Sequence, residues 1–401
     1  MSAKSPLPVT ILNGFLGAGK TTLLQNLLMQ AREMPELRLA VLVNEMSTLD
    51  VDSRILGTTE ILSTSDPLFA SIAAGSISSP EGLRKFQFAI QQFRKADASH
   101  IIIETSGSAH PWPLLEAIRG SRHIRLHGFL SIVDTVTLMQ DYDCGRAIVP
   151  AASHNLASGK RGVENLLAEQ IMFANRILLS KMDRVTEEGL QEVGEAIHPI
   201  NRGADIMGMQ WGNMKLADVI AMPPYDHKHV RQLGAELTQW DKQHGTTTMS
   251  SASEYAIDSI VISDARPFHP QRLWEVYNHF LGQEIYRSKG FFWLPSRDRH
   301  QLLWNQTAGN VGLAVLNYWK VAAIEDERVI LQPEEREELQ RQLADCHPDF
   351  GDRHCNLTVI GERDGLSTFE AALRECFCTN DEIAQWQAGV TFSDPWPDSE
   401  T

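Results

Sequence analysis

The sequence predicts an α/β fold in which a doubly wound, mostly parallel sheet is followed by a second, smaller α+β domain. Three observations support this prediction. Short apolar runs alternate with helical-period segments through the first half of the 401 residues, which is the pattern of a parallel sheet covered on both faces. A glycine-rich stretch separates the first apolar run from the first helical segment. The alternation stops near Pro223, and further strand-like and helical segments follow a polar stretch.

Each element of the first half is predicted from its apolar periodicity. The expected strands are residues 9–13, 38–44, 100–104, 127–133 and 176–180. The expected helices between them are residues 21–31, 80–96, 111–119, 162–173 and 187–198. We place the first domain at residues 1–223, a linker rich in His, Ser and Thr at 224–253, and the second domain at 254–401.

The second domain is predicted from its own apolar runs. The expected strands are AIDSIVIS, GFFWLP, LAVLNYWKVAAI and LTVIG, and the expected helices lie near residues 270–281, 333–344 and 368–377. Phe291, Trp293 and Trp304 recur at strand-like spacing. They are expected in the core, with a target-protein surface as the alternative.

Composition limits the partners and the compartment. The net charge of −15 repels nucleic acid and anionic membranes. Five cysteines are few and odd in number for this length, which argues against a disulfide framework. No signal-like segment and no run of about 18 apolar residues is present. We expect a cytoplasmic protein that binds small molecules or proteins, with no nucleic-acid or membrane partner.

The stretch GFLGAGKT, Gly14 to Thr21, fits the phosphate-loop pattern G-x-x-x-x-G-K-[ST]. It lies between the strand-like VTILN and the helical TTLLQNLLMQA, the order required of a P-loop NTPase. Backbone N–H groups and the positive end of the following helix bind phosphate in such a loop. Lys20 is expected to reach the β- and γ-phosphates, and the Thr21 hydroxyl to bind Mg²⁺. The expected nucleotide-binding residues are Gly14, Gly17, Ala18, Gly19, Lys20, Thr21 and Thr22.

The segment HIIIETSG predicts further catalytic residues. Its strand ends at Glu104, where a P-loop fold has an acidic residue beside the metal and the attacking water. Gly107 follows at a position where a backbone N–H can sense the γ-phosphate. Together with Lys20, these two are the expected catalytic residues. Taken alone, a carboxylate at a strand end is equally typical of a solvated strand terminus.

The segment VLVNEMSTLDVD leaves a strand where a switch segment would lie. Its acids Glu45, Asp50 and Asp52 could hold Mg²⁺ through water or a second metal, or they could be exposed loop residues. The expected metal ligands are therefore Thr21, Glu45 and Glu104.

The segment RILLSKMD predicts the base that is bound. It runs as a strand into Ser180, Lys181 and Asp183, a variant of the [NST]KxD signature of GTPases. Guanine presents two adjacent donors, N1–H and the exocyclic amine, which the Asp183 carboxylate can accept as a pair. Adenine has no such pair. The Lys181 stem is expected along the plane of the base. The sequence therefore predicts GTP and GDP as ligands.

Together, VTILNGFLGAGKTTLL, VLVNEMS, IIIETSG, IVDTV, LLSKMD and KGFFWLPSR resemble the CobW-like P-loop GTPases, a family of metal-handling and metalloenzyme-maturation proteins. The resemblance spans most of the chain. It implies a GTPase domain and a CobW-type C-terminal domain, with the phosphate-loop, Glu104 and SKMD residues in matching roles. Length and layout also resemble the activators of nitrile hydratase, which implies that enzyme as client.

One loop departs from the family. Members usually carry C-x-C-C where this chain has Ser76-Ile77-Ser78-Ser79, and thiolates are the ligands that bind Zn²⁺ and similar ions. A hydroxyl stays protonated near neutral pH and is a poor ligand. A transition metal such as Fe, Co or Zn at this loop is therefore doubtful, whether the serines are natural or engineered.

Other sulfur and imidazole groups could compensate. Cys346, His347, His354 and Cys355 flank one turn and offer four ligands, although ordinary turn residues are the other interpretation. Cys376 and Cys378 are two apart on a helical stretch, so they point to different faces and are expected in the core. Linker histidines His227, His229 and His244 are expected to be solvated.

The leading hypothesis is a Mg²⁺-dependent GTPase that assists metal insertion into a client metalloenzyme. Lys20 and the loop amides would stabilise phosphoryl charge, and Glu104 would position water. No arginine finger or water-orienting glutamine is evident in the sequence, which predicts slow intrinsic turnover. Two alternatives remain open: a metal-independent folding chaperone switched by GTP, and a P-loop kinase of a small acceptor.

Overall fold

The structure, a computed structural model, describes the chain in several ranges. These are residues 5–34, 36–44, 66–72, 76–228, 230–231, 257–280, 285–307, 310–326, 328–344 and 346–397. The chain divides into two compact units, Met1–Ile257 and Asp258–Thr401. Tyr225 is buried in the first unit, where its hydroxyl donates to the Phe173 carbonyl at 2.7 Å. That unit therefore extends past Pro223, and the predicted linker limits of 224 and 253 remain predictions.

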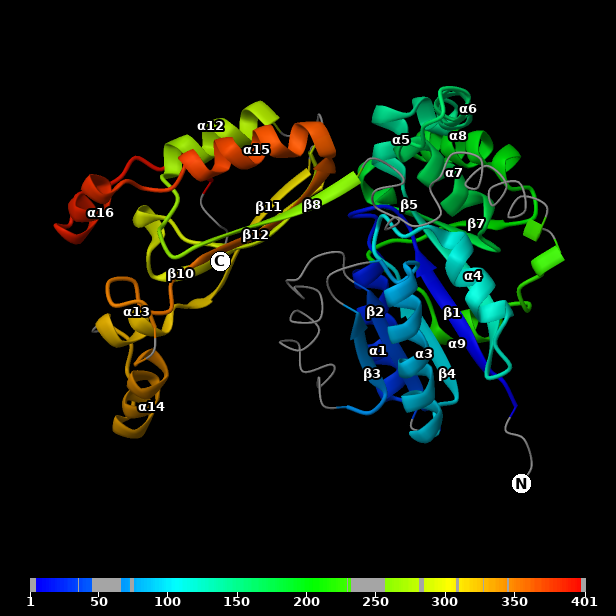
Figure 1. Ribbon diagram of the computed structural model, residues 1–401, viewed down its shortest axis with the longest axis horizontal. Helices are drawn as coiled ribbons and strands as arrows, with labels where there is room; N and C mark the ends of the chain where they lie inside the picture. Colours follow the sequence, from blue (N-terminus) through cyan, green and yellow to red (C-terminus); the bar gives the residue numbers. More distant parts are fainter. Residues whose placement is uncertain are drawn as a thin grey trace. The chain divides into compact units, whose positions relative to one another are not determined.

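The first unit is built on a seven-stranded parallel sheet (Figure 1). Its strand order is β3-β2-β4-β1-β5-β6-β7, so the chain crosses over between strands that are not consecutive. The strands are β1 (Leu7–Asn13), β2 (Leu39–Asn44), β3 (Phe69–Ile72), β4 (His100–Glu104), β5 (Ile124–Asp134), β6 (Arg176–Ser180) and β7 (Asp205–Gly208). The predicted doubly wound α/β fold is confirmed. All strand pairs described in this first sheet are parallel.

Helices follow the strands in the predicted alternation. They are α1 (Lys20–Arg32), α3 (Pro80–Lys95), α4 (Pro111–Arg119), α5 (Thr135–Asp141), α6 (Ile148–Ala157), α7 (Val163–Met172), α8 (Glu187–Ile197) and α9 (Leu216–Ile220). The five predicted strands and five predicted helices of this unit are all present, within a few residues at each end. The sequence analysis missed β3, β7, α5, α6 and α9. Of these, β7 is largely exposed and has no apolar run to reveal it.

One face of the sheet is covered by α1 and α9. Leu23, Leu24 and Leu27 of α1 share a core with Leu12 of β1 and Ile102 of β4. The neighbouring residue Ile11 is also fully buried, because successive residues of a strand face opposite sides and both sides of this sheet are covered. A parallel sheet buried in this way has its loops at the strand ends, and the phosphate loop is one of them.

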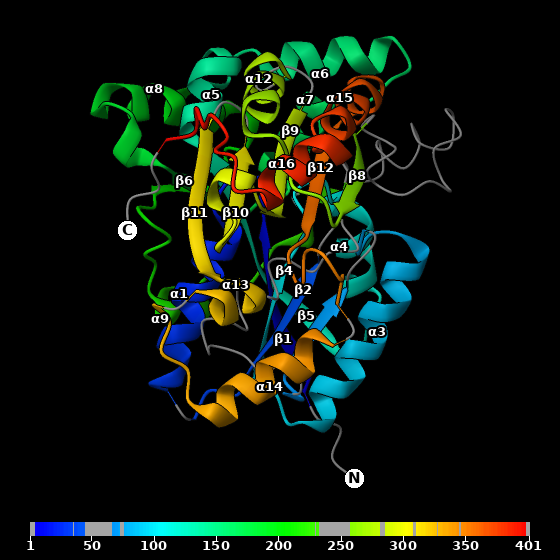
Figure 2. The same cartoon turned by 90° about the vertical axis from the view of Figure 1, so that its left-hand side faces the viewer.

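The second unit has a five-stranded sheet in the order β11-β10-β9-β12-β8. The strands are β8 (Ile257–Asp264), β9 (Ile285–Phe292), β10 (His300–Thr307), β11 (Asn310–Tyr318) and β12 (Cys355–Glu362), and the helices are α12 (Pro270–Phe280), α13 (Lys320–Glu325), α14 (Pro333–Leu343), α15 (Arg363–Glu375) and α16 (Asn380–Gln387). Strands β9 to β12 pair antiparallel where the register is described. Helices α12 and α15 lie side by side (Figures 1 and 2). The smaller α+β domain is confirmed.

The core of the second unit is aromatic. Trp293 and Trp304 are at most 1% exposed, and Phe291 is 8% exposed, so the predicted core placement of all three is confirmed. Cys376 and Cys378 are buried as predicted. Burial raises the pKa of each thiol to about 12, which keeps both protonated and unreactive.

The single strand predicted over LAVLNYWKVAAI is wrong. Strand β11 ends at Tyr318, and α13 begins at Lys320. The Asp352 carboxylate accepts hydrogen bonds from the backbone N–H groups of Lys320 and Val321, at 2.9 and 3.0 Å. A residue some thirty positions away thus satisfies the first turn of this helix, and the local apolar run could not reveal it. Strand β10 and helix α16 were not predicted.

No helix among the described residues is long and apolar enough to span a membrane.

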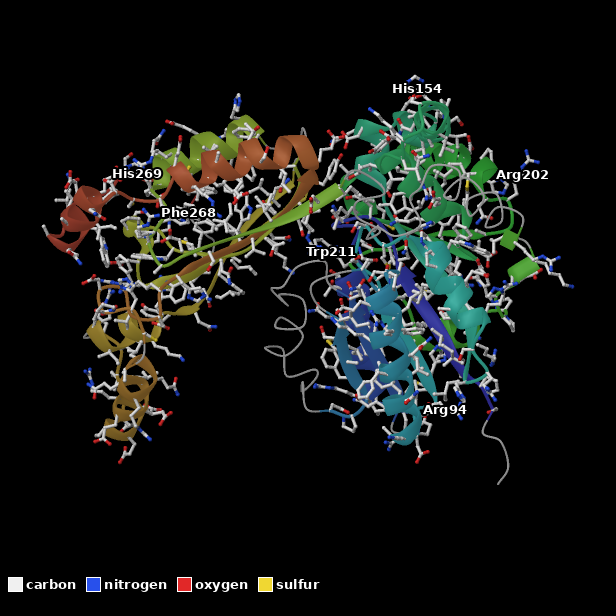
Figure 3. The ribbon with its side chains drawn as sticks, in the orientation of Figure 1. Arg94, His154, Arg202, Trp211, Phe268 and His269 are labelled. Carbon is white, nitrogen blue, oxygen red and sulfur yellow. The ribbon has the colours of Figure 1, made fainter. Side chains whose placement is uncertain are left out.

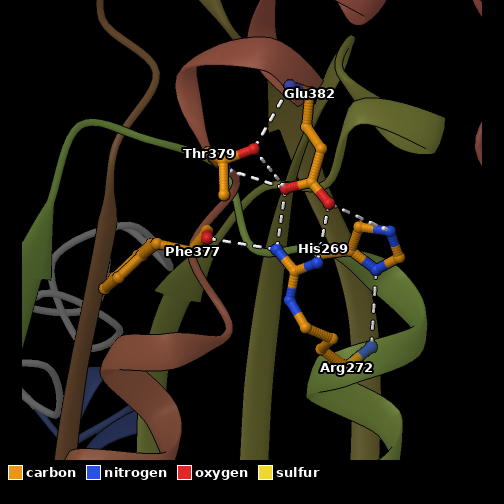
Figure 4. Close-up of polar contacts among 5 residues, drawn as sticks. All are labelled: His269, Arg272, Phe377, Thr379 and Glu382. Carbon is orange, nitrogen blue, oxygen red and sulfur yellow. Dashed lines mark hydrogen bonds and ion pairs between the residues drawn. The ribbon is translucent and has the colours of Figure 1, made fainter.

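A half-buried ion pair joins α16 to α12. The two guanidinium nitrogens of Arg272 donate to the two Glu382 carboxylate oxygens, at 2.7 and 2.8 Å (Figure 4). The Thr379 N–H donates to the same carboxylate at 2.8 Å, and the Thr379 hydroxyl accepts from the Glu382 N–H, which forms a capping box at the start of α16. The hydrogen bonds from Arg272, more than any other factor, lower the pKa of Glu382 to about 2.

We expect Glu382→Gln to destabilise the full chain by about 1–3 kcal/mol at pH 7, since it removes charge-assisted hydrogen bonds. Folding lowers the pKa of Glu382 from about 4.3 in the unfolded chain to about 2. The stabilisation by the ionised Glu382 is therefore complete above about pH 4.3 and is lost as the pH falls toward 2. Urea unfolding followed by tryptophan emission at pH 7, 4 and 3 measures both effects.

The matched control is Glu370→Gln on α15. Glu370 forms an exposed pair with Arg374 four residues later, and such pairs contribute only about 0.3–0.5 kcal/mol. An equal loss from both substitutions, or a Glu382 effect that does not shrink with falling pH, would contradict the role of the Arg272 pair.

Candidate phosphate and guanine site

The phosphate loop depends on three glycines in left-handed backbone conformations. Gly14, Gly17 and Gly19 have φ values of 146°, 71° and 102°. A Cβ at Gly14 would lie 2.1 Å from the carbonyl oxygen of Ile132 on β5, so no side chain fits there. Gly19 is the N-cap of α1. The positive end of the helix dipole therefore lies next to the inside of the loop, where a phosphate would bind.

Lys20 lies inside the loop. It is 5% exposed, and its ammonium donates to the carbonyl oxygens of Gly14 at 2.8 Å and Phe15 at 3.0 Å. These contacts hold a positive charge among the loop amides. Ala18 is buried in the loop, and Thr22 is exposed in the first turn of α1. The stretch thus forms the predicted loop and the start of the predicted helix.

The structure brings Thr21 and Glu104 together. The Thr21 hydroxyl donates to Glu104 Oε1 at 2.6 Å, across 83 positions of sequence. Glu104 ends β4, the neighbour of β1, and is 3% exposed. A hydroxyl and a carboxylate are oxygen donors of the kind that Mg²⁺ prefers, so the chemistry of this pair fits the ion. Of the predicted metal ligands, Glu45 lies outside the described residues, as do Asp50 and Asp52.

Gly107 packs directly on the phosphate loop. A Cβ there would lie 2.7 Å from the backbone nitrogen of Leu16. The Gly107 carbonyl accepts from the Gln170 side chain of α7 at 3.1 Å. The segment after Glu104 is thus held between the phosphate loop and α7, close to where a γ-phosphate would lie in such a loop.

The SKMD segment follows β6 at the same edge of the sheet. The Lys181 ammonium contacts Asp134 Oδ2 at 2.5 Å, and the other Asp134 oxygen caps α5 by accepting from Val136 N–H. Ser180 is buried and bonds the Val133 carbonyl. The Asp183 side chain is 25% exposed, at the accessible end of the segment. The sequence analysis missed Asp134, although its place at a strand end before a helix is an N-cap signal.

Comparison with known protein families shows which family the chain belongs to. Residues 8–208 match the model described as "CobW/HypB/UreG, nucleotide-binding domain", which covers half of the chain. The chain belongs to the CobW/HypB/UreG family. Residues 257–377 match the cobalamin synthesis protein cobW C-terminal domain. The predicted family and the predicted GTPase class are confirmed. Membership of this family excludes the alternative prediction of a P-loop kinase.

Several curated relatives are similar. The Zinc-regulated GTPase metalloprotein activator 1 of Dictyostelium discoideum is 28% identical, over 94% of this chain and 81% of its own. The Zinc chaperone CobW of Pseudomonas aeruginosa is 30% identical, over 48% of this chain and 53% of its own. Among solved structures, Zn(II)-bound YjiA GTPase from E. coli is 19% identical, covers 93% of this chain and 100% of its own, and has a TM-score of 0.34. None of these names mentions nitrile hydratase.

The serine loop of this CobW-family chain is closed by hydrogen bonds. The Ser78 hydroxyl donates to the His110 carbonyl at 2.6 Å, and the Ser76 hydroxyl accepts from Ser78 N–H at 3.1 Å. The Ser79 hydroxyl accepts from Gly82 N–H and caps α3. All three hydroxyls are engaged with backbone groups. This donor set does not fit a transition metal.

Asn44 joins this loop to the segment beyond Glu104. Its side-chain oxygen accepts from Ile77 N–H at 3.1 Å and from Ser106 N–H at 3.4 Å, and its amide donates to the Ile72 carbonyl at 3.0 Å. Asn44 is 2% exposed. One side chain therefore connects the serine loop with the segment that packs on the phosphate loop. The sequence analysis placed Asn44 in a strand and assigned it no role.

A buried ionic cluster holds the other side of the same segment. His110 Nδ1 lies 3.2 Å from Glu169 Oε2, and Arg161 pairs with the second oxygen of Glu169. All three residues are at most 4% exposed. This cluster could not be predicted from the sequence, because His110 lies about fifty positions before the stretch that carries Arg161 and Glu169.

The described residues hold no group of three or more His, Cys, Asp or Glu that could bind a metal. The turn proposed to gather Cys346, His347, His354 and Cys355 does not do so: Cys355 is buried and bonds the Arg266 carbonyl, while His347 stacks on Phe350. His227 is described, whereas His229 and His244 lie outside the described residues.

We expect Asn44→Ala to speed amide hydrogen exchange at Ile77 and Ser106 by about tenfold or more, because each lost hydrogen bond in a buried site costs about 1–3 kcal/mol. Asn201→Ala is the matched control. Asn201 is a buried asparagine that bonds three carbonyls around the end of α7, and its loss should leave Ile77 and Ser106 unchanged. Unaltered protection in Asn44→Ala would refute the connecting role.

Proposed function

We propose that this protein is a Mg²⁺-dependent GTPase that couples its nucleotide state to the activation of a client metalloenzyme. The observation that carries the coupling is the Asn44 side chain, which accepts from both Ile77 N–H and Ser106 N–H. It links the loop where this chain departs from the C-x-C-C pattern to the segment beside the phosphate loop. The names of the relatives, which include zinc chaperones and a metalloprotein activator, support a metalloenzyme as client.

The chain's own residues supply binding and charge. The loop amides and Lys20 hold the phosphates and stabilise the negative charge that develops on the transferred group. Thr21 and Glu104 would hold Mg²⁺, which neutralises phosphate charge when bound. Gly107 and its neighbours contact the phosphate loop through Leu16, so a bound γ-phosphate can change their position and, through Asn44, that of the serine loop.

Asp183 is assigned to guanine recognition. It lies at the exposed end of the segment after β6, with Lys181 held by Asp134. That ion pair fixes the direction of the Lys181 stem and leaves the Asp183 carboxylate accessible to the edge of a base.

We expect Asp183→Asn to weaken GDP binding roughly hundredfold, since it replaces the charged partner of two hydrogen bonds. It should strengthen binding of xanthosine diphosphate, because xanthine has a carbonyl where guanine has its amine and an asparagine amide can donate to it. Calorimetric titration of both nucleotides measures the change.

Two variants make the selectivity test specific. Asp205→Asn changes an exposed carboxylate at the first residue of β7, whereas Gly208 at the other end of this strand lies near Met182 of SKMD. This control should leave the affinities for both nucleotides unchanged. Lys20→Ala should abolish binding of both nucleotides. A variant Asp183→Asn that still prefers GDP would contradict the assignment.

The serine loop favours a second candidate function, a GTP-switched folding chaperone that holds no metal. Its hydroxyls are occupied by backbone groups, and the described residues contain no alternative metal cluster. Both candidates use the same nucleotide switch and differ in whether metal passes through the protein.

Co-expression with a client separates the two candidates. Nitrile hydratase, which is still a prediction from the sequence, is the enzyme to use. We expect its metal content and activity to rise with the wild-type chain and not with Lys20→Ala. If nitrile hydratase activity rises but the purified chain never contains bound metal, the folding chaperone is favoured. If neither the metal content nor the activity of nitrile hydratase changes, this enzyme is excluded as the client.

A further inference from the structure

Trp211 is an exposed tryptophan in the loop after β7 (Figure 3). Its residue is 67% exposed, and the other tryptophans that the structure describes are buried or half-buried. The indole is the largest apolar side chain, and leaving it in water forfeits the free energy of burial. Single exposed apolar residues are common on protein surfaces, so the case for a ligand at Trp211 rests on how its loop is held and what the loop joins.

The backbone at Trp211 is strained and firmly held. Its φ of 54° lies in the left-handed region, which bulky residues rarely adopt. The Asn26 side chain of α1 donates to the Trp211 carbonyl at 2.8 Å. At the next position, a Cβ on Gly212 would lie 2.9 Å from Leu23 N and Thr22 C. The loop is thus fixed against the first turn of the helix that follows the phosphate loop.

The other end of the same loop contacts the guanine-reading segment. A Cβ on Gly208 would lie 3.0 Å from Met182 Sδ, in the middle of SKMD. Met209 N–H donates to the Leu179 carbonyl of β6 at 2.8 Å. The five residues from 208 to 212 therefore run from the segment that holds the base to the helix that holds the phosphates.

We propose that the Trp211 indole packs on the face of the guanine base or of its ribose and determines how tightly, but not which, nucleoside phosphate is held. This inference rests on the proposed guanine site and adds a residue to it. Asp183 reads the edge of the base through hydrogen bonds. An indole contacts the π-face, which every base presents, so its contribution does not depend on the identity of the base.

The decisive variant is Trp211→Asn. Asparagine readily adopts the left-handed backbone conformation, so the loop is preserved while the indole is lost. We expect GDP and xanthosine diphosphate affinities to fall together by about tenfold, the usual effect of losing one aromatic stack. Trp211→Phe keeps a π-face and should recover most of the affinity. Phe88→Ala removes an aromatic residue that is 71% exposed on α3 and should change nothing.

Titration of each variant by calorimetry, with circular dichroism to confirm folding, separates the outcomes. If the wild-type chain binds no GDP, the proposed function itself fails. If the wild type binds GDP and Trp211→Asn binds it equally well, this inference alone is overturned. Unchanged GDP affinity together with loss of client activation would assign the indole to a protein contact and would also overturn it. A change in the ratio of the two affinities would contradict a role confined to the π-face.

Discussion

The parallel pairing of β1 with β4 and β5 fixes where the chemistry of this protein takes place. Leu12 lies opposite Glu104, and Asn13 lies opposite Ser131. The phosphate loop therefore leaves the sheet directly beside the carboxylate that Thr21 contacts. A shift of one residue in the pairing of β4 with β1 would turn Glu104 to the other face of the sheet. The close approach of Gly14 to the Ile132 carbonyl depends on the register of β1 with β5.

Residues whose role depends on their neighbours in the chain could be predicted from the sequence. The glycine pattern around Lys20 requires a loop of one shape, and the apolar runs before Glu104 and Lys181 predict the buried strands that end at Glu104 and Ser180. Asn44, Asp134 and His110 could not be assigned in this way. Each acts through partners that lie tens of positions away and come close only when the strands pair. The local sequence marks Asp134 as an N-cap but does not reveal its contact with Lys181, and it marks neither Asn44 nor His110.

The second unit shows the same limit for a fold element. The apolar run that includes Tyr318 and Val321 has the composition of one strand, and strand propensity is mostly a measure of fit to a half-buried surface. The distant Asp352 carboxylate satisfies the first turn of α13 and so changes the outcome for the second half of the run. Trp293 was predicted correctly because large apolar side chains that recur at strand-like spacing, as it does with Phe291, usually line the core.

The hydrogen bonds of the Asn44 side chain determine how much coupling this one residue can carry between the segment after Glu104 and the serine loop. Its side chain makes two hydrogen bonds to the loops that it joins, through Ile77 and Ser106. Each contributes about 0.5–1.5 kcal/mol net, so the coupling through this residue is about 1–3 kcal/mol, or roughly 5- to 150-fold in an equilibrium. The Ser78 bond to the His110 carbonyl acts in parallel, since His110 is fixed to α7 by Glu169. In the proposed mechanism, coupling of this size through hydrogen bonds is enough to switch a client without a metal ion in the serine loop.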